Sequence, residues 1–263
     1  MSLKTLSSGL SECIQFKNAI QLILGRLFFR KTNFVSYRLN ELEVLADHAG
    51  GDVNSIRACL VGQMYKPYID YISSKVGPKL SALDLGANAG GFSLMLKNEG
   101  FEIERLVAVE MNPLTFSRLQ LNLLTNIGPK AKCINAAAAC NNENVKITFG
   151  RGSTGESMDA INENENRDFT IPSLTINSII NDNFSDKPID LIKCDIEGSE
   201  WPIFEKDECC NKIKDAKFLL IEVHPIANRS IQDFEVNTAR LGFQKIELSK
   251  SSDLDLFLFE NQK

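Results

Sequence analysis

Two patterns of hydrophobic and polar positions divide the chain near residue 78. From Leu80 onward, short apolar runs alternate with amphipathic segments, which is typical of a parallel sheet covered by helices. The apolar runs predict seven strands, at residues 82–85, 106–110, 132–137, 189–195, 218–223, 243–248 and 254–259. The polar segment 249–253 joins the last two runs, so we expect them to form a closing antiparallel hairpin.

This order of elements predicts an α/β fold for residues 79–263. Five strands with helical crossovers, followed by a hairpin, resemble the layout of the class I methyltransferase variant of the Rossmann-like fold. We therefore expect a seven-stranded sheet with helices on both faces. A plain dinucleotide-binding sheet does not need the terminal hairpin. The fold alone does not establish a function, because function depends on the residues of the site.

Residues 1–78 predict an N-terminal helical region that caps this domain or contacts a partner. Gly50-Gly51 marks a break inside it. Three tyrosines have helical spacing, at positions 65, 68 and 71. This spacing favours a helix face that packs against the domain. The alternative is an aromatic wall above a bound acceptor. A homo-oligomer formed through these helices is a further expectation. The helices are predicted at 12–29, 37–48, 53–62 and 64–75.

Residues 141–187 interrupt the simple alternation of strands and helices. Apolar runs at 145–149 and 169–174 predict a short strand pair, and the stretch between them is polar and rich in glycine. A long loop in a compact domain is usually functional or disordered. A lid over the substrate and a disordered surface segment are the two interpretations, and the sequence does not decide between them.

A glycine loop follows the first predicted strand, from Asp84 to Gly91. Glycines at a strand-to-helix turn allow a sharp bend and the close approach of a ligand, and the helix N-terminus offers free N–H groups. The spacing departs from the GxGxxG of dinucleotide sites, because Asn88 replaces a middle glycine. This favours the amino-acid half of S-adenosylmethionine as the ligand. The expected cofactor-binding residues here are Asp84, Gly86, Ala87, Asn88 and Gly90.

Glu110 ends the second predicted strand, where a carboxylate can accept hydrogen bonds from the two ribose hydroxyls of an adenosine. Capping of the helix that starts near Pro113 is its alternative role. Met111, Asn112 and Ala137 complete the expected adenosine contacts. NAD would use the same loop and acid, so these residues predict a nucleoside cofactor without identifying the reaction.

The fourth predicted strand leads into a longer motif, Asp190-Leu-Ile-Lys193-Cys-Asp195-Ile-Glu197-Gly198-Ser-Glu200. It resembles the D-x-x-K-x-D-x-E-G-x-E motif of the FkbM family of methyltransferases. The loop 86–90 is similar to that family's G-A-N-x-G, and the segment 220–224 is similar to its acidic fifth strand. The resemblance spans about residues 80–224. It implies S-adenosylmethionine as methyl donor and a hydroxyl of a sugar, glycan or other natural product as acceptor.

Three polar residues of these motifs are candidates for the chemistry, since ligands of open α/β sheets bind beyond the carboxyl ends of the strands. His224 could act as the base that takes the acceptor proton, or be held by backbone hydrogen bonds. Asp195 and Glu197 could hold Mg²⁺. Alternatively, Asp195 could face the amino group of the cofactor while Glu197 and Glu200 orient loops or cap the next helix. We favour the metal-free arrangement, because the sequence shows no second acid pair dedicated to binding an ion.

Lys193 and Trp201 receive structural predictions. Lys193 lies in an apolar run and needs a charged partner, for which Asp84 on the neighbouring strand is the nearest candidate. Trp201 either shapes the mouth of the pocket or packs on a helix.

Composition excludes some classes of function. The net charge of −5 argues against nucleic acid as the main partner. Seven cysteines without a CxxC pair predict reduced thiols in a cytoplasmic protein. The apolar segment 20–29 contains Arg26 and is too short to span a membrane, so no stable membrane insertion is expected. An NAD-dependent oxidoreductase and a catalytically silent nucleoside-binding module are the rival functions.

Overall fold

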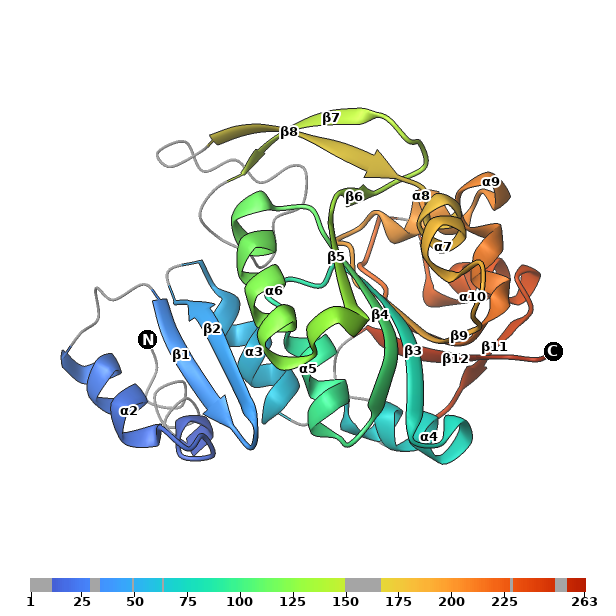
Figure 1. Ribbon diagram of the computed structural model, residues 1–263. Coiled ribbons are helices and arrows are strands. Elements are labelled where there is room, and N and C mark those ends of the chain that lie inside the picture. Colours follow the sequence, from blue (N-terminus) through green and yellow to red (C-terminus); the bar gives the residue numbers. More distant parts are fainter. Residues whose placement is uncertain are drawn as a thin grey trace.

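A seven-stranded sheet forms the centre of the molecule (Figure 1). The computed structural model describes residues 11–28, 34–48, 50–62, 64–149, 167–227, 229–248 and 255–263. The strand order is β11-β12-β10-β9-β3-β4-β5, in which β12 is antiparallel to both neighbours and the other pairs are parallel. The predicted α/β fold is confirmed. The strands are β3 (Lys79–Leu85), β4 (Glu102–Glu110), β5 (Ala131–Asn135), β9 (Ile189–Cys194), β10 (Ala216–Glu222), β11 (Phe243–Ile246) and β12 (Leu256–Asn261).

Most predicted strands differ from the observed ones only at their ends. The run predicted at 132–137 is an exception, because β5 ends at Asn135 and a separate strand β6 (Ala137–Ala138) pairs with β8 instead. The terminal hairpin of β11 and β12 is present. Its predicted polar connection, 249–253, lies outside the described residues.

Both faces of the sheet are apolar. Successive side chains of a strand point to opposite faces, so an apolar strand contributes to a core on each side. Leu80 and Ala82 belong to one buried core, whereas Leu83 and Leu85 belong to the other. The first core includes α3 (Asp52–Leu60), α4 (Lys66–Val76), α5 (Gly91–Asn98) and α6 (Pro113–Asn126). The second includes α7 (Ile176–Phe184), α8 (Glu200–Phe204), α9 (Asp207–Cys210) and α10 (Ile231–Arg240).

The helix predicted at 37–48 is wrong. These residues belong to an antiparallel hairpin of β1 (Phe34–Leu39) and β2 (Leu42–Asp47). Leu42, Val44 and Ala46 alternate with more exposed residues, and Asn40 takes the positive φ of 51° that the tight turn needs. The N-terminal region is therefore not wholly helical. Its first long helix is also shorter than predicted, because α2 spans Ala19–Phe28.

Side chains of α6 bind this N-terminal hairpin through its backbone. The Asn122 amide accepts a hydrogen bond from Leu45 N and donates to Leu45 O, at 2.8 and 2.9 Å. Asn126 makes the same pair of bonds with Glu43. The two amides thus satisfy backbone groups at the free edge of β2. A buried ion pair between Arg118 and Asp52 joins α6 to α3.

A smaller sheet stands above the main one (Figure 1). It contains β6, β8 (Arg167–Leu174) and β7 (Asn144–Phe149), in which β7 and β8 form the predicted strand pair. Within the region 141–187, α7 packs into the second core, and residues 150–166 lie outside the described residues. Among the residues that the structure describes, no helix is long and apolar enough to cross a membrane.

Candidate active site

The glycine loop turns sharply between β3 and α5 at the carboxyl end of the sheet. Gly86 has a φ of 73°, and a Cβ built on it would lie 1.7 Å from the carbonyl oxygen of Asp195. The N–H groups of Gly86 and Ala87 both donate to the carbonyl oxygen of Val109. Glycine is therefore required at position 86 both for its backbone conformation and for the close approach of β9. Asn88, the residue that replaces the middle glycine, also has a positive φ, 50°.

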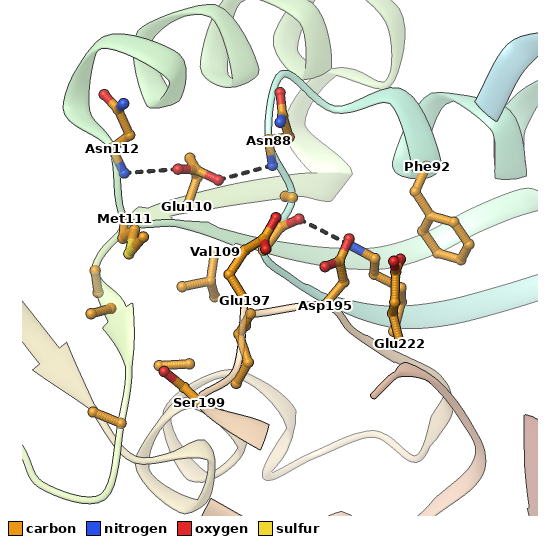
Figure 2. A pocket seen from close by; sticks show the side chains of 18 of the residues that line it. Asn88, Phe92, Val109, Glu110, Met111, Asn112, Asp195, Glu197, Ser199 and Glu222 are labelled. Atoms are coloured by element: carbon orange, nitrogen blue, oxygen red, sulfur yellow. Dashed lines mark hydrogen bonds and ion pairs between the residues drawn. The ribbon is translucent and has the colours of Figure 1, made fainter. Parts of the chain in front are cut away.

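The Glu110 carboxylate connects the loop to the next turn (Figure 2). Its oxygens accept hydrogen bonds from Asn88 N at 2.9 Å and from Asn112 N at 2.8 Å. Burial raises the pKa of Glu110 to about 7, although these two bonds act in the opposite direction. The capping role belongs to Asn112, whose side chain accepts from the first turn of α6. Each Glu110 oxygen retains a lone pair for a further donor.

Lys193 forms the centre of a buried ion-pair network below the loop. Its Nζ lies 3.6 Å from Asp84 Oδ1 and 3.2 Å from Asp195 Oδ2, and it donates to Gly86 O at 2.9 Å. Burial acts to lower the pKa of Lys193, but the carboxylates of Asp195 and Asp84 raise it well above its usual range. The predicted pairing of Lys193 with Asp84 is confirmed. The second partner, Asp195, was not predicted, although side chains two residues apart along a strand lie on the same face.

A cavity of about 460 Å³ opens beside the loop, within the usual size range of small-molecule sites. Most of the predicted cofactor-binding residues line it, whereas Asp84 and Gly90 do not. Asp84 is fully buried, where it accepts a hydrogen bond from Ser93 Oγ, and Gly90 packs against α6. The predicted residues in the lining are Gly86, Ala87, Asn88, Glu110, Met111, Asn112, Ala137, Asp195 and Glu197.

Three further carboxylates line the cavity. In Figure 2, Glu197, Asp195 and Glu222 form a row, which comes from the ends of β9 and β10. Burial raises the pKa of Glu222, and the nearby charge of Asp195 adds to this effect. Glu197 has a φ of 53°, a conformation that non-glycine residues seldom adopt. This part of the cavity is acidic.

His224 was predicted either as the base or as a residue held by backbone hydrogen bonds, and in the structure its ring contacts two carboxylates instead. It does not line the cavity, and its two ring nitrogens lie 3.2 Å from Glu197 Oε2 and 3.1 Å from Glu200 Oε1. The hydrogen bonds with Glu197 and Glu200 raise the pKa of His224 to about 10. An imidazole that already holds its proton at neutral pH cannot accept another. The arrangement therefore disfavours His224 as a general base.

The aromatic residues divide between packing and the cavity. Tyr68 and Tyr71 donate from their hydroxyls to Leu256 O and Glu260 Oε2, as expected for a packing face. Tyr65, however, lines the cavity, and its ring contacts that of Phe92 edge-on at 5.0 Å. Trp201 is buried and donates to the carbonyl oxygen of His224 at 2.8 Å.

A family model decides between the functions that the glycine loop left open. The model described as the methyltransferase FkbM domain matches residues 84–259, which is more than half of the chain. The chain belongs to the FkbM methyltransferase family. The matched segment begins in β3 and ends in β12, so it includes the loop, Glu110 and the three carboxylates. The sequence has no match among curated proteins.

Solved structures of methyltransferases are also similar to this FkbM-family chain. The methyltransferase FkbM from Methylobacillus flagellatus KT is 18% identical in sequence to this chain, and the TM-score is 0.48. The alignment covers 80% of this chain and 52% of that one. The present chain thus spans about half the length of that relative. The magnesium protoporphyrin IX methyltransferase from Synechocystis, solved with bound SAM, is 11% identical with a TM-score of 0.45, covering 80% of this chain and 84% of that one.

Several lining residues of the FkbM-family site were not predicted from the sequence. Tyr65, Val145 and Ser173 had a signal, in the aromatic-wall alternative and in the lid alternative for 141–187. Cys59 comes from α3, and Met64 lies just before α4. No local motif marks these two positions, since tertiary packing alone brings them to the cavity. Glu222 also had a signal, because it is an acid at the end of a strand next to the active-site motif.

Proposed function

We propose that this chain transfers a methyl group from S-adenosylmethionine to a hydroxyl group of a sugar, glycan or other natural product. One observation supports this more than any other. A single cavity joins Glu110, an acid suited to a ribose, to an acidic and aromatic wall formed by Asp195, Glu222, Tyr65 and Phe92. A methyl donor and an acceptor need such a shared space, because the transfer is a direct displacement between them.

The residues around Glu110 fit the adenosine half of the donor. The lone pairs that remain on its oxygens can accept from two ribose hydroxyls. Ala136, Ala137 and Ala138 line the neighbouring wall, where small side chains leave room for a flat base. At the loop, Gly86, Ala87 and Asn88 line the part of the cavity in which the methionine half of the donor would lie. When bound, the donor supplies an electrophilic methyl group on a sulfonium.

The acidic and aromatic wall fits a polyhydroxylated acceptor. The edge-on rings of Tyr65 and Phe92 provide an apolar surface on which the C–H face of a sugar ring can pack. The carboxylates of Asp195 and Glu222 can accept hydrogen bonds from hydroxyl groups. In this proposal Asp195 is a catalytic residue that orients the acceptor hydroxyl, and Lys193 fixes Asp195 at 3.2 Å. The hydroxyl loses its proton to Asp195 or Glu222 as its oxygen bonds to the methyl group and the methyl–sulfonium bond breaks, which leaves S-adenosylhomocysteine.

The small sheet contributes to the same cavity and supports the lid interpretation for the strands β7 and β8, whereas α7, which also belongs to the region 141–187, packs into the second core. Asn141, Val145 and Ser173 line the cavity. We infer that this part of the chain closes over the acceptor and excludes water from the reaction. Hydrogen exchange of β7 and β8 in the wild-type chain tests this inference, and we expect it to slow when both donor product and acceptor are bound.

Calorimetry and a transfer assay together test the proposed function. We expect S-adenosylhomocysteine to bind and NADH not to bind; tight NADH binding without affinity for S-adenosylhomocysteine would contradict the proposal. Purified protein is then incubated with methyl-labelled S-adenosylmethionine and a panel of sugars and hydroxylated natural products. Label in a base-stable methyl ether supports O-methylation, whereas label in an amine excludes it. Asp195→Asn should lower kcat about 100-fold while changing donor affinity little.

A further inference from the structure

Three potential metal ligands meet at the ends of β9 and β10. One ligand atom each from Asp195, Glu197 and His224 lies within 4.8 Å of the other two. His224 Nε2 and Glu197 Oε2 are 3.2 Å apart. Nitrogen and oxygen ligands lie about 2.1 Å from a bound first-row cation, so they are about 3–4 Å from one another. Small side-chain rotations would therefore bring all three atoms onto one ion.

A second group of contacts orients the histidine toward this point. Its Nδ1 lies 3.1 Å from Oε1 of Glu200, whose side chain is fully buried. Metal-binding histidines usually donate their other ring N–H to a carboxylate in this way. Glu200 also accepts from Ile196 N at 2.9 Å, which fixes the backbone between the two carboxylate ligands. Glu200 is not itself one of the three ligands, so it is an independent support for the site.

The charges around this point also favour a cation. Asp195 shares Lys193 with Asp84, at 3.2 and 3.6 Å. Glu197 and Glu200 both face the ring of His224, one on each nitrogen. In the metal-free protein the protonated imidazole offsets part of the negative charge of Asp195, Glu197 and Glu200, and this offset is lost when Nε2 gives up its proton. A divalent ion would offset the repulsion among these carboxylates.

We propose that Asp195, Glu197 and His224 bind one divalent metal ion, whose remaining coordination positions take oxygen atoms of the acceptor. One imidazole and two carboxylates suit Mn²⁺ or Zn²⁺ better than Mg²⁺. The ion replaces the proton on Nε2, and it activates a coordinated hydroxyl as a Lewis acid. The acceptor part rests on the proposed function. The sequence favoured a metal-free arrangement because it shows no second acid pair. The fold brings His224 to Asp195 and Glu197 as a third potential metal ligand.

Metal binding can be measured without a known acceptor. Protein dialysed against EDTA is titrated with Mn²⁺, and free Mn²⁺ is followed by its EPR signal. We expect one ion per chain. Glu197→Gln removes a ligand at a partly exposed position and should weaken binding at least tenfold, and Glu200→Gln should weaken it about 10–100-fold. Glu222→Gln is the matched control, a neighbouring cavity carboxylate outside the triad, and should change affinity less than about threefold.

Two results would overturn the metal site: no saturable Mn²⁺ binding by the folded wild-type chain, or an equal loss of binding in Glu197→Gln and Glu222→Gln. Circular dichroism of each variant establishes that it is folded, and Glu197→Gln alone decides the question if the buried Glu200 variant does not fold. Binding of S-adenosylhomocysteine is measured on the same samples. Cofactor binding without Mn²⁺ binding removes the metal and leaves the proposed function, whereas the reverse result removes the proposed function and leaves the metal.

Discussion

The Cα of Gly86 faces the carbonyl oxygen of Asp195 so closely that a Cβ would lie 1.7 Å from that oxygen. The hydrogen bond from Asp195 N to Leu85 O holds the two strands together at this point. One contact thus joins the cofactor loop to the strand that ends in the acidic wall. Because the clash is with backbone, neither side can move without breaking the sheet.

Gly86→Ala should therefore abolish cofactor binding and destabilise the fold by more than about 3 kcal/mol, since backbone strain and steric overlap add. Gly128→Ala is the matched control: its φ of 76° is similar, and nothing lies within 4 Å of its Cβ position. We expect that variant to lose about 1–2 kcal/mol and to bind S-adenosylhomocysteine normally. Urea unfolding and calorimetry measure both effects. Normal binding by a folded Gly86→Ala protein would contradict the requirement for glycine.

Replacing Lys193 tests the buried ion-pair network. Lys193→Met leaves Asp84, which is fully buried, without its cation, so we expect a loss of about 3–5 kcal/mol in the free energy of unfolding. Adding Asp84→Asn should recover part of that loss. The control is Lys217→Met on the adjacent strand, whose pair with Asp190 is more exposed and should cost less than about 1 kcal/mol. Equal losses in the two single variants would refute a special role for Lys193.

Hydrophobic pattern predicted the main sheet because each of its strands is a short apolar run bounded by polar residues. It failed for the hairpin of β1 and β2. Leu39, Leu42 and Leu45 have helical spacing, whereas Leu42, Val44 and Ala46 have strand spacing, so a short window is ambiguous. The structure resolves the ambiguity through contacts from α6, which is far away in the sequence.

The candidate site shows the same division. The glycine loop and Glu110 lie in local motifs, so their positions could be predicted from spacing alone. The role of His224 depends on Glu200, which comes from another segment, and no spacing in the sequence reveals that contact. Lys193 has one partner on a neighbouring strand, Asp84, whereas its second partner, Asp195, lies two residues further along the same segment, a spacing that places both side chains on one face. The motif places Asp84 among the cofactor contacts, yet burial gives it a supporting role below the loop.

The amide of Asn122 links the N-terminal hairpin to the cofactor loop, because it donates to Ala89 O at 2.8 Å as well as binding Leu45. Asn122→Ala should cost about 2–3 kcal/mol of stability and weaken S-adenosylhomocysteine binding about fivefold to tenfold. Asn126→Ala is the control, since it binds the same hairpin at Glu43 and has no bond with the loop among the described residues. It should lose similar stability and keep its affinity. An unchanged dissociation constant in both variants would show that the hairpin does not support the loop.

Cofactor binding should depend on pH through Glu110. Its pKa is raised to about 7 by burial, so a substantial fraction of the free protein has a neutral carboxyl near pH 7. Ribose hydroxyls and the N–H groups of Asn88 and Asn112 all donate to the ionised form, and binding should therefore release a proton. We expect affinity for S-adenosylhomocysteine to fall as the pH drops below about 7. Calorimetry in buffers of different ionisation enthalpy measures the released proton directly, and Glu110→Gln should bind more weakly with little pH dependence in this range. Proton uptake on binding, or the same pH dependence in Glu110→Gln, would assign the titration to another group.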